Sequence, residues 1–235
     1  MTDTYALFDF AGTLADLVPS TESIYGALIF HETGIKVEDG LLLSRIDSLV
    51  STLPAYSSVL IRSKSQKYQY YNIYNQHILQ GLGLIHKISP EAVYAQFSRT
   101  KRHWQLKKGV LDIFYELSGL QIKIGILSNF DSHLVSIVAD LLGPNHLPDY
   151  LHISQSEGHE KPSPEFYRTF FEKYNIDPLK CTYFGDSYLL DFLPATKLGM
   201  QAYLLDESNR FPWLSPTIPK ITSSLNILKN KINQL

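Results

Sequence analysis

Five short, uninterrupted apolar runs are spread along this 235-residue chain, and a long gap separates the first run from the second. Runs of this kind are typical of strands that are buried on both faces, as in parallel sheets. Segments with helical spacing lie between the later runs, so we expect helices on the faces of the sheet. The five runs are Tyr5–Phe8, Ile122–Leu127, Tyr150–Ile153, Cys181–Phe184 and Ala202–Leu205.

The long gap, from about Ser20 to Lys107, carries apolar and aromatic residues at helical spacing and no convincing strand. One expected helix begins at Ser89-Pro90, an N-cap followed by a proline, and we place Trp104 on the same helix. Because the first strand must then pair with strands beyond this block, the block is an insertion. We therefore predict an α/β fold: a three-layer, Rossmann-like parallel sheet core from residues 1–19 and 106–235, with a helical domain at 20–105.

Polar side chains follow four of these runs. In open parallel sheets, ligands bind outside the carboxyl ends of the strands. A set of carboxylates, a hydroxyl and an amine suits a phosphoryl group held with Mg²⁺, which prefers hard oxygen ligands. Taken singly, each residue is more often a turn, cap or exposed residue, so their order and shared position favour a site. The residues are Asp9, Ser128-Asn129, Lys161, and Asp186 with Asp191.

The sequence around these residues resembles the four motifs of the haloacid dehalogenase-like (HAD) hydrolase superfamily. The matching segments are 9–14 (Asp-Phe-Ala-Gly-Thr-Leu), 127–129 (Leu-Ser-Asn), 161–164 (Lys-Pro-Ser-Pro) and 185–191 (Gly-Asp-Ser-Tyr-Leu-Leu-Asp). The resemblance covers nearly the whole chain and includes a C1-type helical cap inserted after the first motif. The last two motifs, with residues 128–131, look most like one branch of the superfamily.

The resemblance implies a Mg²⁺-dependent hydrolase of a small phosphorylated metabolite, working through an aspartyl-phosphate on Asp9. Backbone N–H groups of the loop after Asp9 would help to bind the phosphate, and the carbonyl of Ala11 would help to hold the metal. The implied roles are catalysis by Asp9, Thr13, Ser128 and Lys161; phosphate binding by Phe10, Ala11, Ser128, Asn129 and Lys161; and metal binding by Asp9, Ala11, Asp186 and Asp191. The Phe10 side chain is expected only to pack.

The sequence departs from the family pattern at Ala11, where the phosphatases have a second aspartate that protonates the leaving oxygen and then activates water. General acid–base catalysis typically raises the rate by about 10²–10⁴-fold, so the absence of this acid should change which substrates the protein can hydrolyse. Four interpretations stay open: a substrate with a good leaving group, such as an acyl phosphate; a substitute acid at Asp16, His31 or His77; another reaction of the superfamily; or a phospho-ligand-binding protein with weak or no turnover.

Two other reactions of the superfamily fit the residues less well. Phosphonoacetaldehyde hydrolases resemble the segment Asp-x-Ala-Gly-Thr but need a cap lysine that forms a Schiff base. The candidates here, Lys36, Lys64 and Lys67, have no apolar setting that would lower the pKa. Haloacid dehalogenases also lack the second acid, but they work without metal and do not keep Gly-Asp-Ser, which stands here at 185–187. The residues therefore favour phosphate chemistry.

Composition indicates which classes of binding partner the protein does not attract. With 21 basic and 23 acidic side chains the formal charge is −2, so no global field attracts nucleic acid or an anionic membrane. The basic segment 101–108 is interpreted as a solvated helix face. A single cysteine excludes an internal disulfide framework. No apolar run approaches the roughly 18 residues of a membrane span, and the N-terminus is unlike a signal peptide. We expect a cytoplasmic protein with a small phosphorylated substrate.

Overall fold

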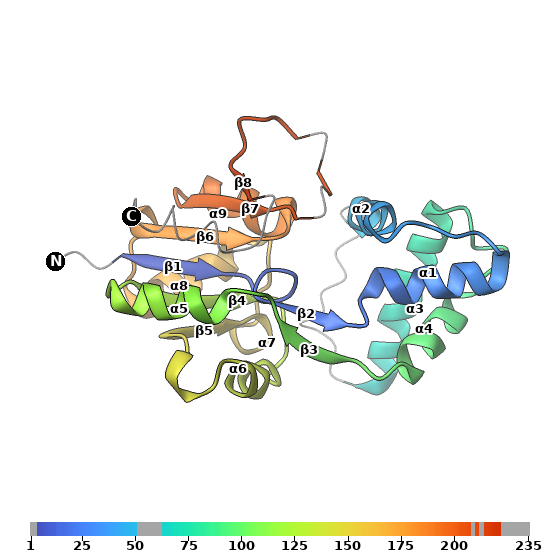
Figure 1. Ribbon diagram of the computed structural model, residues 1–235, viewed down its shortest axis with the longest axis horizontal. Helices are drawn as coiled ribbons and strands as arrows, with labels where there is room; N and C mark the ends of the chain where they lie inside the picture. Colours follow the sequence, from blue (N-terminus) through green and yellow to red (C-terminus); the bar gives the residue numbers. More distant parts are fainter. Residues whose placement is uncertain (1–3, 51–62, 208–209, 212–213, 222–235) are drawn as a thin grey trace. The chain divides into compact units, whose positions relative to one another are not determined.

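The computed structural model describes residues 4–50, 63–207, 210–211 and 214–221. Figure 1 shows its helices and strands with their labels. In chain order they are β1 (Tyr5–Phe8), β2 (Ala15–Val18), α1 (Thr21–Thr33), α2 (Asp39–Val50), α3 (Lys64–Gly81), α4 (Pro90–Arg99), β3 (His103–Leu106), α5 (Val110–Gly119), β4 (Lys123–Ser128), α6 (Leu134–Leu142), the 3-10 turn η2 (Pro144–His146), β5 (Tyr150–Ile153), α7 (Ser154–Glu157), α8 (Pro164–Tyr174), the 3-10 turn η3 (Pro178–Lys180), β6 (Cys181–Gly185), the π-helical turn η4 (Tyr188–Phe192), α9 (Leu193–Lys197), β7 (Gln201–Leu205) and β8 (Lys220–Ile221).

Six of the strands form one sheet in the order β5-β4-β1-β6-β7-β8. The paired strands run parallel throughout, and β1 lies between β4 and β6. Phe8, the last residue of β1, is level with Ile126 of β4 and Phe184 of β6. Because parallel strands end at the same edge, the residues that follow these three strands emerge close together. The predicted α/β fold with a parallel sheet is confirmed.

The side chains of β1 alternate between two buried clusters. Ala6 and Phe8 pack with residues of α5 and α6, whereas Tyr5 and Leu7 pack with residues of α8 and α9. Helices therefore cover both faces of the sheet, which gives the three layers (Figure 1). This arrangement explains why the strand segments read as unbroken apolar runs rather than as alternating ones: no face of a central strand meets water.

The chain divides into two compact units. One contains the large sheet and comprises residues up to Asp16 together with Trp104–Glu207 and the segment 214–221. The other spans Leu17–His103 and also includes residues 210–211. The second unit has its own core, to which helices α1 to α4 contribute residues such as Ile29, Ile46, Ile78 and Val93. The chain leaves the sheet unit within β2 and returns within β3, and these two strands pair with each other. The sequence predicted a core of residues 1–19 and 106–235 and a helical domain of residues 20–105. Those limits remain a prediction.

Trp104 was expected on a helix, and that prediction is wrong. Helix α4 ends at Arg99, the next residue is extended, and Trp104 lies in β3. Its indole ring packs against the rings of Phe10 and Phe130, with centroid distances of 5.0 and 5.6 Å. A lone aromatic residue fits a helix stripe and a short strand equally well, so tertiary packing decided its place.

The basic segment 101–108, expected as a solvated helix face, contains the strand β3 instead. The guanidinium of Arg102 donates hydrogen bonds to the Pro19 carbonyl at 2.9 Å and to the Thr21 hydroxyl at 3.2 Å. It thereby ties the return of the chain to the segment that leads into α1. Strands β2 and β3 were not foreseen because each has four residues, some of them exposed, and neither forms a continuous apolar run.

Candidate active site

Asp9 is the first residue beyond β1. Its backbone N–H donates to the carbonyl of Phe184 in β6 at 2.9 Å, which carries the pairing one residue past the strand. The side chain is buried, and the hydroxyl of Thr13 donates to Asp9 Oδ2 across 3.5 Å. The carboxylate is thus fixed at the edge of the sheet. Its other oxygen, Oδ1, accepts a hydrogen bond from Lys161.

Gly12 lies at the turn of the loop after Asp9. Its φ of +82° is in the left-handed region, which glycine adopts without a steric penalty. A Cβ atom at this position would also overlap the carboxylate oxygen Asp186 Oδ2. Glycine is therefore required here twice, once for the backbone conformation and once for the close approach of the loop to Asp186.

Lys161 supplies the buried amine of the site. It lies in the loop between α7 and α8, and its side chain is 3% exposed. The Nζ atom donates to Asp9 Oδ1 and to Asp191 Oδ1, both at 2.6 Å, and lies 3.5 Å from the hydroxyl of Tyr183. The amine therefore bridges the first and last of the sequence motifs, as expected from their positions at strand ends.

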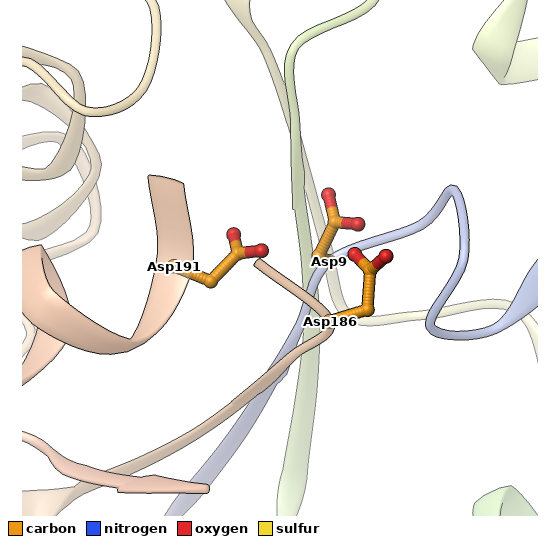
Figure 2. A group of neighbouring side chains, drawn as sticks. All are labelled: Asp9, Asp186 and Asp191. Atoms are coloured by element: carbon orange, nitrogen blue, oxygen red, sulfur yellow. The ribbon is translucent and has the colours of Figure 1, made fainter. Parts of the chain in front are cut away.

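Three carboxylates meet at this point, and we call Asp9, Asp186 and Asp191 the carboxylate cluster. One oxygen of each lies within 4.8 Å of the others. Figure 2 shows the three side chains: Asp9 comes from the end of β1, and Asp186 and Asp191 come from the segment after β6. The π-helical turn η4 carries Asp191, whose Oδ2 accepts a hydrogen bond from the Ser187 N–H at 3.1 Å.

The carboxylate cluster holds more negative charge than Lys161 balances. If all three carboxylates are ionised, one ammonium group leaves a net charge of −2 in a mostly buried place. Burial raises the pKa of Asp9 to about 7, against the attraction of Lys161 and with added repulsion from Asp191 and Asp186. Burial also raises the pKa of Asp191, again against the attraction of Lys161.

The amine stays charged in this setting. Burial alone would lower the pKa of Lys161, but the Asp191 and Asp9 carboxylates outweigh that effect and raise the pKa of the amine above its usual value. A divalent cation would neutralise the remaining negative charge, and carboxylate oxygens are the ligands that Mg²⁺ prefers. The donor set therefore fits a hard divalent cation.

Comparison with known proteins identifies the family of the chain. A family model described as haloacid dehalogenase-like hydrolase matches residues 5–199. The chain belongs to this family. The resemblance inferred from the four motifs is thus confirmed.

The relatives of this HAD-like hydrolase include the haloacid dehalogenase-like hydrolase domain-containing protein 3 of Homo sapiens, which is 28% identical over 115 residues. The match covers 49% of this chain and 45% of the human protein. The same protein from Xenopus laevis is 24% identical over 152 residues, or 60% of each chain. This is the branch that the last two motifs resembled. The chain spans about half the length of these curated relatives.

Solved structures show the same fold. The HAD hydrolase YfnB of Bacillus subtilis, described as bound to magnesium, has a TM-score of 0.64 at 20% identity, covering 99% of this chain and all of that one. An HAD phosphatase of Thermococcus onnurineus has a TM-score of 0.55 at 17% identity, covering 97% of each chain. At these identities the likeness concerns the fold alone.

Three further residues were expected at the phosphate. Ser128, the last residue of β4, is buried beside the end of β1. The Asn129 amide is engaged with the backbone of Lys161: it donates to the carbonyl at 2.9 Å and accepts from the N–H at 2.7 Å. The Phe10 ring packs against Trp104, as expected for a side chain with a packing role.

The structure gives each candidate for a substitute acid a partner of its own. Asp16 forms an ion pair with Lys107 at 3.7 Å. His31 Nδ1 lies 2.8 Å from the Glu32 carboxylate on the exposed side of α1, and His77 Nε2 lies 2.8 Å from the Leu49 carbonyl. Ala11, where the second aspartate is missing, is exposed. Partners of this kind are what residues with a structural role would have.

Two tyrosines at the site escaped the sequence reasoning. Tyr183 lies inside β6, and its hydroxyl donates to Asp191 Oδ1 at 3.1 Å. Tyr167 of α8 donates to the Leu190 carbonyl in η4 at 2.6 Å. Burial raises the pKa of both phenols, so they stay neutral donors. The signal was available, because a tyrosine in a buried run must find a partner for its hydroxyl, but the partner cannot be named from sequence.

Proposed function

We propose that the protein hydrolyses a small phosphorylated metabolite with the help of Mg²⁺, through an aspartyl-phosphate on Asp9. One observation carries this proposal. The Lys161 amine lies 2.6 Å from both Asp9 and Asp191, inside the carboxylate cluster. A nucleophilic carboxylate beside a fixed cation and two more carboxylates is an arrangement suited to phosphoryl transfer, where positioning and charge stabilisation supply most of the catalysis.

Asp9, Asp186 and Asp191, with the backbone carbonyl of Ala11, are the groups proposed to hold Mg²⁺. The ion would supply positive charge that lets an anionic substrate approach an anionic nucleophile. The support from this chain is the excess negative charge of the cluster and its all-oxygen donor set. The set is assembled from the segments that directly follow β1 and β6 and from η4, so the fold itself determines its geometry.

The remaining steps use the protein's own groups. The Asp9 carboxylate attacks phosphorus, the bond to the leaving oxygen breaks, and the phosphoryl group is carried on Asp9. Lys161, Ser128 and backbone N–H groups of the loop after Asp9 hold the non-reacting oxygens. A water oxygen then attacks phosphorus, the bond between phosphorus and the Asp9 oxygen breaks, and inorganic phosphate leaves with the protons of the water, which restores the Asp9 carboxylate. Thr13 keeps the nucleophile loop in place through its contact with Asp9.

Ala11 shapes the substrate preference. Without a carboxylic acid at this position, a poor leaving group must depart as an unprotonated alkoxide, whereas an acyl or aryl phosphate releases a stable anion. We therefore propose substrates with good leaving groups. The helical unit Leu17–His103 is proposed to act as the cap of the family, closing to exclude water during transfer.

The leaving group should control the rate. We expect acetyl phosphate and 4-nitrophenyl phosphate to be hydrolysed with a kcat/KM about 10²-fold or more above that of simple alkyl phosphates, since the missing acid is worth this much. Phosphate release is measured across the series with MgCl₂ and again after chelation with EDTA. Turnover should be lost with EDTA and restored by added Mg²⁺. Equal rates across the series, or full activity in EDTA, would contradict the proposal.

Gly12→Ala should weaken magnesium binding. A left-handed alanine costs roughly 1–2 kcal/mol of folding free energy, and its Cβ displaces Asp186. A shifted ligand lowers metal affinity by about 10–100-fold. Gly34→Ala is the matched control, because Gly34 also has a positive φ, of 73°, but a Cβ added there meets nothing within 4 Å. Urea unfolding should show similar losses for both variants, and Mg²⁺ titration a loss for Gly12→Ala alone. Equal Mg²⁺ affinity would argue against Asp186 as a ligand.

A second candidate function is phospho-ligand binding with weak or no turnover, which Ala11 favours. It predicts saturable binding of inorganic phosphate or vanadate without Asp9-dependent release of phosphate from any ester. Phosphonate cleavage is disfavoured, because Lys36, Lys64 and Lys67 are all exposed and none has the buried setting of a Schiff-base lysine. Among the described residues, no helix is long and apolar enough to cross a bilayer.

A further inference from the structure

The loop that carries Lys161 is held by the side chain of Asn129, the residue that directly follows β4. Lys161 lies among the six residues between the end of α7 and the start of α8, outside any helix or strand. Both of its backbone polar groups are paired with Asn129, which directly follows β4: the amide N–H of Lys161 donates to Asn129 Oδ1 at 2.7 Å, and the Lys161 carbonyl accepts from Asn129 Nδ2 at 2.9 Å.

This pair of bonds has only one workable orientation. An asparagine amide offers an acceptor on one side and two donors on the other, and a backbone segment offers the complementary N–H and carbonyl. Two bonds made by one planar group fix the position and the direction of the backbone together. The amide therefore fixes where the Lys161 side chain starts, while its far end is held by Asp9 and Asp191.

Accurate placement of this amine matters for the chemistry. A displacement of about 1 Å in a positioning group can cost on the order of 10²-fold in rate. Asn129 was expected among the phosphate-binding residues, and the structure pairs its side-chain amide with the backbone of Lys161. We infer that Asn129 is a positioning residue, whose side chain acts on the substrate phosphoryl group through Lys161. The inference rests on the proposed function, in which the Lys161 amine binds the substrate phosphoryl group.

A neighbouring residue provides a matched control. The Ser154 hydroxyl also makes a pair of bonds to the backbone of one residue, Phe130, accepting from its N–H at 3.0 Å and donating to its carbonyl at 3.2 Å. That carbonyl accepts from the Gln155 N–H as well, at 3.2 Å. Both clamps hold backbone near the end of β4, but the Ser154 clamp does not involve the Lys161 loop. Asn129→Ala and Ser154→Ala therefore remove similar bonds, and only the first should disturb the lysine.

The first measurement uses the protein alone. Amide hydrogen exchange should accelerate at Lys161 in Asn129→Ala and at Phe130 in Ser154→Ala, each variant leaving the other amide unchanged. If Asn129→Ala fails to fold, Asn129→Asp is used, since it keeps the acceptor for the Lys161 N–H and replaces the donor to the carbonyl by a repelling oxygen. Unchanged exchange at Lys161 in the folded variant would overturn the inference.

The second measurement is a double-mutant cycle with Lys161→Met, read by kcat/KM for acetyl phosphate and by the Kd of orthovanadate in MgCl₂. Asn129→Ala should lower kcat/KM about 10²-fold in the wild-type background. It should change kcat/KM by less than about 2-fold when the amine is already gone. Ser154→Ala should have the same fold effect in both backgrounds. Equal losses for Asn129→Ala in the two backgrounds would mean that it does not act through Lys161.

The two proposals fail in different ways. If the wild type shows no Asp9-dependent turnover, the proposed function is wrong, and the vanadate cycle and the exchange data still decide the role of Asn129. If turnover depends on Asp9 but the two mutations are additive in both readouts, the proposed function stands and the positioning role is wrong. If vanadate does not bind the wild type, the positioning role is also wrong, because it requires an oxyanion at the Lys161 amine.

Discussion

Asp9→Asn should remove the phosphatase activity almost completely. The substitution keeps the size of the side chain but replaces a carboxylate nucleophile by an amide, which cannot attack phosphorus or carry the phosphoryl group. Loss of the nucleophile in a covalent mechanism lowers kcat by on the order of 10⁴–10⁶-fold. The measurement is phosphate release from acetyl phosphate and 4-nitrophenyl phosphate at saturating Mg²⁺, with wild type and variant purified in the same way.

Asp149→Asn is the matched control for this variant. Asp149 is paired with Lys123 and with the Ile124 N–H at the beginning of β4, away from the carboxylate cluster. Its activity should stay within about 2-fold of the wild type, as expected for a distant and independent position. Asp9→Asn also removes a partner of Lys161, so circular dichroism and urea unfolding are used to show that the variant is folded. Turnover that persists in folded Asp9→Asn would contradict the assignment of the nucleophile.

Ala11→Asp should increase the hydrolysis of poor substrates. The new carboxylic acid can protonate a departing alkoxide and then activate water, steps worth about 10²–10⁴-fold. Ala11 is exposed, so the larger side chain has room. We expect this gain in kcat/KM for alkyl phosphates, and a much smaller gain in kcat/KM for acetyl phosphate, because kcat/KM reports the transfer to Asp9 and this leaving group needs no proton. Both substrate classes are assayed by phosphate release.

Ala11→Asn is the control for shape. Asparagine has nearly the same size as aspartate but cannot transfer the proton, so it should give no gain with either substrate class. If Ala11→Asp does no better than Ala11→Asn with alkyl phosphates, the absent acid does not limit the rate. A substitute acid would then be sought at Asp16, with Asp16→Asn tested first despite its ion pair with Lys107.

The strand framework could be predicted because local sequence determines it. β1, β4, β5, β6 and β7 are buried on both sides, and such strands have a signature that needs no partner to be identified. The edge at which ligands bind follows from parallel pairing alone, which is why Asp9, Lys161 and Asp191 could be expected together. The structure then brought these three side chains within hydrogen-bonding distance.

Other features depend on contacts between distant segments and have no local signature. The pairing of Asn129 with Lys161 joins residues 32 positions apart, and the bond from Tyr183 to Asp191 requires the π-helical turn η4 to return the chain over β6. Trp104 was assigned to a helix because the spacing of apolar residues does not distinguish a short, partly exposed strand from the end of a helix. The residues of the carboxylate cluster could be named from the sequence, but their distances and hydrogen bonds required the structure.

The most direct test of the account is to find the phosphoryl group on the protein. Wild type mixed with acetyl phosphate and MgCl₂ is quenched rapidly in acid, digested and mapped by mass spectrometry. We expect one phosphoryl group on Asp9, labile to hydroxylamine and absent from Asp9→Asn. Because Ala11 cannot activate water, the intermediate should accumulate in the wild type and should decline in Ala11→Asp. Turnover without a phosphoryl group on Asp9, or with one on another residue, would contradict the account.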